Sequence, residues 1–266
     1  MSTQICIDMT VPLDSIARYA DVLLDTSNTG DYPNALNGVQ LENRSPIRGL
    51  AAAVDFSSRS IDAAIASNSN LLLVHHGMFW SGLERLTGSA YRRVQKLIES
   101  DIAVYASHLP LDRHPTLGNN VLLARELGLE PTGEFARFEN FFIGVSGEND
   151  IETSVLATRA RQFAAANGGD IRVSPSRNGR RTKRWAICTG AGAAADTLRE
   201  ASTMGIDTLI VGEGPHWTAV QADENDLVII YAGHYATETL GVRALAQHLA
   251  ERFKLPWHFV SAPTGL

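Results

Sequence analysis

Three short apolar runs along this chain are each followed at once by side chains that bind metals. Apolar runs of this length that alternate with helical segments are typical of buried parallel strands. The carboxyl ends of such strands meet at one edge of a sheet, and open α/β sheets bind their ligands there. The side chains just past the three runs are, in chain order, His75 and His76, His108 and Asp112, and His234 and Glu238. The sequence therefore predicts an α/β fold with a metal site at its strand ends, with room for two ions.

The segments around the first two runs predict how their strands are connected. A helix is expected after Pro12, where apolar residues recur at helical spacing. Strands and helices then alternate as far as residue 128, which predicts a parallel sheet covered by helices on both faces. The expected elements are strands over 49–55, 70–74 and 102–106, and helices over 57–67, 90–100 and 119–127.

The pattern restarts near residue 129, which predicts a second lobe. Its expected elements are strands over 140–145, 170–173, 185–188 and 208–211, a helix over 151–166 and another that ends at Met204. A final strand over 227–231 carries the third pair of ligands and leads into a helix over 239–253. We therefore expect a metal-binding α/β lobe built from residues 1–128 plus 228–266, and an inserted α/β lobe over residues 129–227.

The composition is ordinary for a globular protein and is acidic. The chain has 266 residues, of which 44% are hydrophobic and 20% charged, and its formal net charge is −6. An acidic chain does not suit duplex nucleic acid, so we expect no such partner. One basic stretch, RNGRRTKR at 177–184, is interpreted as a solvated loop.

The sequence also bears on the compartment. The N-terminal segment lacks a basic region followed by a long apolar run, so no signal peptide is expected. No stretch approaches the roughly 18 apolar residues of a membrane span. The two cysteines, Cys6 and Cys188, fit a reduced compartment without a disulfide framework. We therefore expect a cytoplasmic protein that does not bind a membrane.

The histidine pairs at the strand ends each have two interpretations. On a strand, His75 and His76 point to opposite faces, which suits two neighbouring ions, or one ion and one substrate. Alternatively, one of them is a hydrogen-bonded core residue and the other lies at the surface. The spacing of His234 and Glu238 puts both on one face of a helical turn. That pair suits Zn, Mn, Fe or Ni, or forms a simple hydrogen bond.

His108 and Asp112 bracket a turn that Pro110 stiffens. A carboxylate has two oxygens, so Asp112 could bind one ion or bridge two. Alternatively, Asp112 could cap a turn with Thr116 or Asn119. His108 could be a ligand, or it could orient one.

Two glycine-containing turns in the expected inserted lobe are further candidates. The segment GEGPHW at 212–217 follows a strand, and its glycines let the backbone approach a ligand closely. There His216 could act as a general acid or base and Trp217 as a stacking surface, or the segment could be a tight turn whose tryptophan packs inward. The turn TGAG at 189–192 is weak evidence for phosphate binding, because it lacks a Walker lysine and the full G-x-G-x-x-G.

Five segments together resemble the NIF-three-like family, whose members are also called dinuclear metal-centre hexameric proteins. Its YbgI-type branch is the most similar, because HHGMFW lacks the proline that follows the paired histidines in many other branches. That difference bears on substrate access rather than on the metal site. The segments follow the family's order and span essentially the whole chain: LNGVQLE (36–42), LLVHHGMFW (72–80), SHLPLDRHPTLGNNVLLA (107–124), GEGPHW (212–217) and YAGHYATETLGV (231–242).

The resemblance implies a set of ligands and an assembly. It implies two interlinked α/β lobes and a toroidal homo-hexamer, a trimer of dimers, with the sites open to the inner cavity. It implies two divalent transition-metal ions, which could be Zn, Fe, Mn or Ni. The implied ligands are His75, His76, Asp112, His234 and Glu238. We expect His108, which lies in a matched segment, to orient a ligand.

The expected chemistry is metal-assisted hydrolysis. Two ions held by imidazoles and carboxylates activate a water and polarise a substrate oxygen, which favours cleavage of a C–N, amide or phosphoester bond in a small molecule. His216 is then the expected proton donor to the leaving group. Some members of the family are called GTP cyclohydrolase 1 type 2, and opening a purine ring is hydrolysis of this kind.

Two alternatives belong to other classes of protein. The first is a metal-binding or metal-trafficking protein, or a regulatory adaptor, that turns nothing over; His216 and Trp217 are then dispensable. The second is a ring that binds single-stranded nucleic acid, with residues 177–184 lining its channel. The acidic net charge argues against the second alternative.

Overall fold

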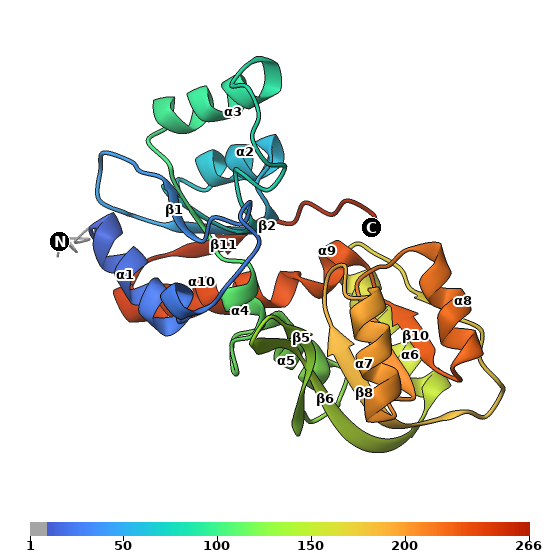
Figure 1. Cartoon of the computed structure of the whole chain (residues 1–266). Helices are drawn as coiled ribbons and strands as arrows, with labels where there is room; N and C mark the ends of the chain where they lie inside the picture. Colours follow the sequence, from blue (N-terminus) through green and yellow to red (C-terminus); the bar gives the residue numbers. More distant parts are fainter. Residues whose placement is uncertain (1–9) are drawn as a thin grey trace, which may run out of the picture. The chain divides into compact units, whose positions relative to one another are not determined.

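A computed structural model describes residues 10–266 of the protein and divides the chain into two compact units (Figure 1). The first unit comprises the residues up to Pro110 together with Val242–Ala262. The second comprises Leu111–Gly241 and Pro263–Leu266. Cys6 and the start of the segment for which no signal peptide is expected lie outside the described residues.

The first unit is built on a sheet whose strand order, within the described residues, is β1-β4-β3-β2-β11. Strands β11, β2, β3 and β4 run parallel, as the alternation of strands and helices predicts, whereas β1 pairs antiparallel with β4 at one edge. The carboxyl ends of β2, β3 and β4 therefore lie side by side. The bounds are β1 Gly38–Leu41, β2 Leu50–Asp55, β3 Leu71–His76, β4 Ala103–Ala106 and β11 Trp257–Phe259.

Helices cover both faces of this sheet, which explains its nearly continuous apolar strands. On one face, Ile61 and Leu97 of α2 and α3 pack with Leu72, Val74 and Val104 of the sheet. Helices α1 and α10 lie on the other face (Figure 1). The helices are α1 Leu13–Leu23, a 3-10 turn Thr26–Asn28, α2 Ser58–Ala66, α3 Gly88–Glu99, the short α4 Leu109–Asp112 and α10 Thr239–Phe253.

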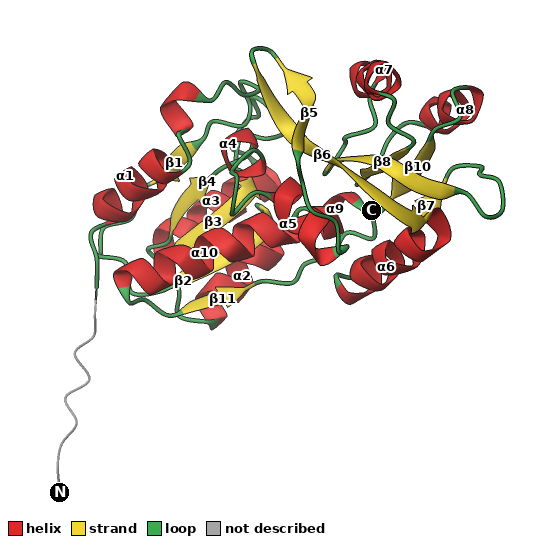
Figure 2. Ribbon diagram, turned by 90° about the horizontal axis from the view of Figure 1, so that it is seen from below, coloured by secondary structure: helices red, strands yellow, loops and turns green. Residues whose placement is uncertain are grey.

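The second unit has a mixed sheet in the order β5-β6-β8-β9-β10-β7, again within the described residues. Strands β8, β9 and β10 are parallel, while β5, β6 and β8 are successively antiparallel and β7 is antiparallel to β10. The long strand β6 is prominent in Figure 2. The bounds are β5 Gly133–Phe138, β6 Phe141–Glu152, β7 Arg172–Val173, β8 Arg181–Cys188, β9 Thr208–Val211 and β10 Val228–Tyr231.

Alternate residues of β8 supply two separate apolar cores, one on each face of this sheet. Trp185 and Ile187 pack with helices α5, α6 and α9, whereas Ala186 and Cys188 pack with α7 and α8. The helices are α5 Asn119–Glu126, α6 Thr153–Ala166, α7 Ala195–Met204, α8 His216–Glu224 and α9 His234–Thr237.

The two units divide the chain at different positions from those expected for the lobes. Strand β10 pairs with β9 and β7 in the second sheet, and Leu123 of α5 and its C-cap residue Leu127 belong to the same core as Trp185. The segments 111–128 and 228–241 therefore lie in the second unit rather than with residues 1–110. Among residues 10–266, no helix combines the length and the apolar run that crossing a membrane requires.

Candidate metal centre

Two adjacent histidines end the central strand of the first sheet. The side chains of His75 and His76 are buried at the end of β3, and their ring centroids are 4.8 Å apart. His75 Nδ1 lies 2.9 Å from the carbonyl oxygen of Ser107, just past β4, and His76 Nδ1 lies 2.9 Å from Oδ1 of Asp55, at the end of β2. The two histidines therefore bond to oxygens on different neighbouring strands, His75 beside β4 and His76 beside β2, although their rings lie close together.

His108 joins these two rings in a buried cluster of three imidazoles. Its ring centroid lies 4.9 Å from that of His75 and 5.7 Å from that of His76. One ring nitrogen from each histidine lies within 4.8 Å of those of the other two, a spacing from which a metal ion can draw ligands. Trp80 covers the cluster, stacked on His76 and edge-on to His108, with its ring centroid 4.5 Å from each of theirs.

A buried carboxylate, Asp31, holds His108 in place. Asp31 Oδ1 lies 2.8 Å from Nδ1 of His108, and Oδ2 accepts from the backbone N–H of Leu109 and from the amide of Asn37. Burial alone would raise the pKa of Asp31, but these hydrogen bonds and the nearby imidazole bring it below its ordinary value. His108 therefore has one fixed orientation.

All three rings are held through Nδ1, and this decides which nitrogen can bind a metal. Carbonyl and carboxylate oxygens only accept hydrogen bonds, so Nδ1 carries the hydrogen in each case. The neutral ring then has its lone pair on Nε2. Histidines that bind metals are commonly oriented in this way by a carboxylate or carbonyl behind the ring.

The second unit carries a fourth histidine of the same kind. His234 Nδ1 lies 2.8 Å from Oε1 of Glu213, and His234 Nε2 lies 3.2 Å from Oε2 of Glu238. Burial alone would lower the pKa of His234, but hydrogen bonds and charge from Glu238 and Glu213 raise it to about 9. In the metal-free chain, the imidazole of His234 is therefore protonated at neutral pH and lies between the carboxylates of Glu213 and Glu238.

The turn TGAG packs against this pair instead of forming an open cradle. A Cβ atom added at Gly190 would collide with the carboxylate of Glu238, and the backbone N–H of Gly190 donates to Oγ1 of Thr237. Glycine at this position therefore allows the β8–α7 turn to approach Glu238 closely.

Asp112, the remaining expected ligand, ends α4 and is buried. Its Oδ1 accepts from Nδ2 of Asn119 at 2.8 Å, so the hydrogen bond considered from the sequence does form. Such a bond does not compete with metal binding, because it orients the carboxylate and uses one lone pair of one oxygen.

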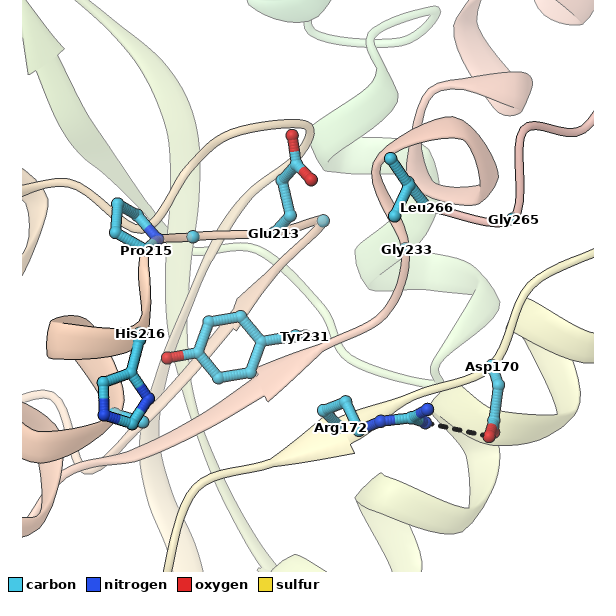
Figure 3. A pocket seen from close by; sticks show the side chains of 12 residues that line it. Asp170, Arg172, Glu213, Pro215, His216, Tyr231, Gly233, Gly265 and Leu266 are labelled. Carbon is cyan, nitrogen blue, oxygen red and sulfur yellow. Dashed lines mark hydrogen bonds and ion pairs between the residues drawn. The ribbon is translucent and has the colours of Figure 1, made fainter.

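His216 lies apart from these ligand atoms, in the wall of a separate cavity of about 450 Å³ within the second unit (Figure 3). The cavity lies beside the carboxyl ends of β9 and β10. Arg172 and Asp170, which form an ion pair at 3.0 Å, lie on one side of the Tyr231 ring, and His216 lies on the other. Glu213 also lines this cavity and so connects its wall to His234. The segment GEGPHW is a strand-to-helix turn, but its Trp217 is 39% exposed rather than packed inward.

The basic stretch at 177–184 is a loop only as far as Arg180, because β8 begins at Arg181, and several of its arginines pair with neighbouring acids. Arg180 pairs with Asp226 at 2.6 Å and Arg184 pairs with Glu148 at 3.5 Å. Arg181 pairs with Asp150 in the same way. These ion pairs reduce the positive field that a nucleic-acid backbone would need.

The carboxylates that accept hydrogen bonds from Nδ1 of the histidines were not among the expected site residues. They are Asp55, Asp31 and Glu213. Asp55 directly ends a strand, so the rule that pointed to the histidines also points to it. Glu213 lies inside a segment that was singled out for its histidine and tryptophan. Asp31 is different, because it precedes β1 by several residues and no local pattern connects it with His108.

The donors suit a first-row transition metal. The first unit presents imidazole nitrogens, and the second presents one imidazole with the carboxylates of Asp112 and Glu238. Nitrogen and carboxylate ligands of this kind are those of Zn, Mn, Fe and Ni sites, so the residues fit the metal that the resemblance implies.

The profile of the Duf34/NIF3 (NGG1p interacting factor 3) family matches residues 12–264. The chain belongs to the Duf34/NIF3 family. A protein from Deinococcus radiodurans called "GTP cyclohydrolase 1 type 2 homolog" is 40% identical over 240 residues, which are 89% of each chain. A protein of the same name from Halobacterium salinarum is 40% identical over 261 residues, or 95% of this chain and 98% of the relative.

Two solved structures have the same fold over nearly the whole chain. The protein ybgI, described as of unknown function, superposes with a TM-score of 0.86 at 30% identity and covers 96% of this chain and 100% of its own. A protein from Thermus thermophilus superposes with a TM-score of 0.81 at 33% identity, over 96% and 100% of the two chains. These matches confirm the expected family, its YbgI-type branch and its α/β fold.

Proposed function

We propose that this NIF3 family protein binds two divalent transition-metal ions and acts as a metal-dependent hydrolase on a small molecule. The proposed ligands are His75, His76, Asp112, His234 and Glu238. The observation that carries the proposal is that every histidine in this set is buried or partly buried and is fixed through Nδ1 by an oxygen acceptor. That is the arrangement of imidazoles prepared to bind through Nε2.

The protein's own residues would prepare the ligands and handle the substrate. Two bound ions supply Lewis acidity and lower the pKa of a coordinated water. The carboxylates of Asp55 and Glu213 hold the rings of His76 and His234 in the orientation that binding needs. A buried carboxylate that accepts from Nδ1–H also makes the ring a better donor at Nε2.

We assign substrate binding to the cavity of about 450 Å³, whose volume suits a small molecule. Its wall offers the phenol ring of Tyr231, the guanidinium of Arg172 and the imidazole of His216. His216 is the proposed catalytic residue, donating a proton to the leaving group. Its position on the cavity wall, with Glu213 linking the same wall to His234, supports this role.

GTP is the first substrate to test, because the named relatives are called GTP cyclohydrolase 1 type 2 homologs. Purified metal-loaded protein is incubated with GTP, with and without a chelator, and then with a panel of amide, C–N and phosphoester substrates. We expect turnover of at least one substrate that the chelator abolishes and that His216→Ala reduces about 100-fold or more while the metal content is retained. Trp217→Phe, on the adjacent and exposed residue, is the matched control.

Absence of chelator-sensitive turnover across the panel would exclude the hydrolase. If the chain still bound two ions, and if its biological activity needed neither His216 nor Trp217, it would be a metal-binding, metal-trafficking or regulatory protein. We further propose the cytoplasmic location and the toroidal homo-hexamer implied by the family resemblance. Light scattering on the purified protein tests the assembly, with six chains per particle as the expected result.

A further inference from the structure

One buried asparagine, Asn119, connects two of the segments that carry the proposed ligands. Its side chain is fully buried at the start of α5, where Gly118 is the N-cap residue. Nδ2 donates to Oδ1 of Asp112 at 2.8 Å, and Oδ1 accepts from the backbone N–H of Gly241 at 2.7 Å. All of these groups lie in the second unit.

The partners of Asn119 fix the orientation of its amide. A backbone N–H can only donate, so the amide oxygen must face Gly241, which leaves the amide nitrogen to donate to Asp112. An amide satisfies both partners at once without adding charge. The donor of the Asn119 amide is therefore matched to Asp112, and its acceptor is matched to Gly241.

The chain is shaped locally to bring these three groups together. Hydrogen bonds from His114 N to Leu111 O and from Gly118 N to His114 O fold the segment after Asp112 back on itself, so that Asn119 returns beside Asp112. At the other end, a Cβ added at Gly241 would lie 2.8 Å from Oδ1 of Asn119. Glycine there allows the amide to reach the backbone of α10.

Gly241 lies three residues after Glu238, within the first turn of α10. The amide of Asn119 thus holds the carboxylate of Asp112 directly and the segment that follows Glu238 through its backbone. We propose that Asn119 is a positioning residue of the metal centre, which sets the carboxylates of Asp112 and Glu238 relative to each other before an ion binds. This inference rests on the proposed function, since it assumes that both carboxylates are ligands.

The adjacent Asn120 provides a matched control. It is equally buried, but its Nδ2 donates to the carbonyl of Ile143 and its Oδ1 accepts from the backbone N–H of Thr189. Asn120 Nδ2 also donates to the backbone carbonyl of Asp112, at 3.4 Å, and not to its carboxylate. Replacing Asn120 therefore removes a buried amide of the same size without releasing the Asp112 carboxylate.

The test measures the binding of Co²⁺ to the metal-free full-length chain by calorimetry and by the visible absorption of the bound ion. In Asn119→Ala we expect one ion to bind about 10- to 100-fold more weakly and the absorption spectrum to change. In Asn120→Ala we expect a lower Tm with both affinities and the spectrum unchanged. Asn119→Asp keeps the acceptor for Gly241 but replaces the donor to Asp112 with a carboxylate oxygen, so it must also change the spectrum, and it serves if Asn119→Ala fails to fold.

A double-mutant cycle separates positioning from general destabilisation. If Asn119 acts through Asp112, Asn119→Ala adds less than about threefold to the loss of affinity in Asp112→Ala. Independent losses that multiply would overturn the inference, as would wild-type affinities and spectrum in the Asn119 variants. If the wild-type chain binds no ion, the proposed function fails as well; if it binds two and the Asn119 variants bind them equally, only this inference fails.

Discussion

Nδ1 of His234 lies 2.8 Å from Oε1 of Glu213, a carboxylate that both anchors a proposed metal ligand and lines the large cavity of the second unit. The turn after β9 brings it there, since the N–H of Glu213 donates to the carbonyl of Gly190. Glu213 thus couples the orientation of His234 to the wall on which His216 lies.

Replacing Glu213 with Gln should weaken metal binding at His234 without removing a ligand. The amide oxygen still accepts from Nδ1–H, but the negative charge that makes Nε2 a better donor is lost, so affinity should fall about 10- to 100-fold. Titration of the metal-free variant with Zn²⁺ measures this directly. The control is Glu224→Gln, an exposed acid in α8, which should bind as the wild type does; equal affinities in the two variants would contradict the role of Glu213.

Metal uptake should depend on pH through His234. In the metal-free chain its pKa is raised to about 9 because hydrogen bonds and charge from Glu238 and Glu213 outweigh the effect of burial. An ion must displace that proton, so affinity should rise with pH until about pH 9 and then level off. Calorimetry at pH 7.5 in buffers of different ionisation enthalpy should show release of about one proton on binding at this pair.

The same shift affects the stability of the metal-free chain, and the sign follows from linkage. A pKa raised above its ordinary value of 6.5 stabilises the folded state fully below that pH, and the contribution is lost as pH rises through about 9. Denaturation midpoints should therefore fall between pH 6.5 and 9 in the wild type, and fall less in His234→Gln. Parallel pH profiles for the two chains would contradict the assignment.

Asp31→Asn tests the network that holds His108. The carboxylate accepts from His108, Leu109 and Asn37, and hydrogen bonds to a buried charge are stronger than neutral ones. We expect the free energy of unfolding to fall by about 2–4 kcal/mol at pH 7. Because the pKa of Asp31 is lowered, this contribution should disappear as pH falls through the folded-state value. Asp14→Asn, at an exposed pair with Arg18, should change stability by less than about 0.5 kcal/mol.

Much of the fold could be predicted because strand periodicity and ligand position are local signals. The helix over 239–253 and the strand over 208–211 have the bounds that the sequence predicts. Strands β1, β5 and β11 were not predicted. The boundaries of the two units could not be predicted from local patterns, because the pairing of β10 with β9 depends on the folded structure and not on periodicity.

The candidate site likewise contains some residues that local sequence signals predict and others that only the folded structure reveals. Strand-end position led to His75, His76, His234 and Glu238, because that rule needs only a few neighbouring residues. The contacts of Asp31 with His108 and of Asn119 with Gly241 span 77 and 122 residues of chain, so only the folded structure brings them together.

Metal content tests most directly whether this chain binds a pair of metal ions through the five proposed ligands. Protein purified without chelators and analysed by elemental mass spectrometry should contain about two divalent transition-metal ions per chain. His75→Ala and Glu238→Ala should each lose at least one of them, while His258→Ala, an exposed histidine of the first unit, should lose none. A wild-type content near zero, or the same content in all three variants, would contradict the account.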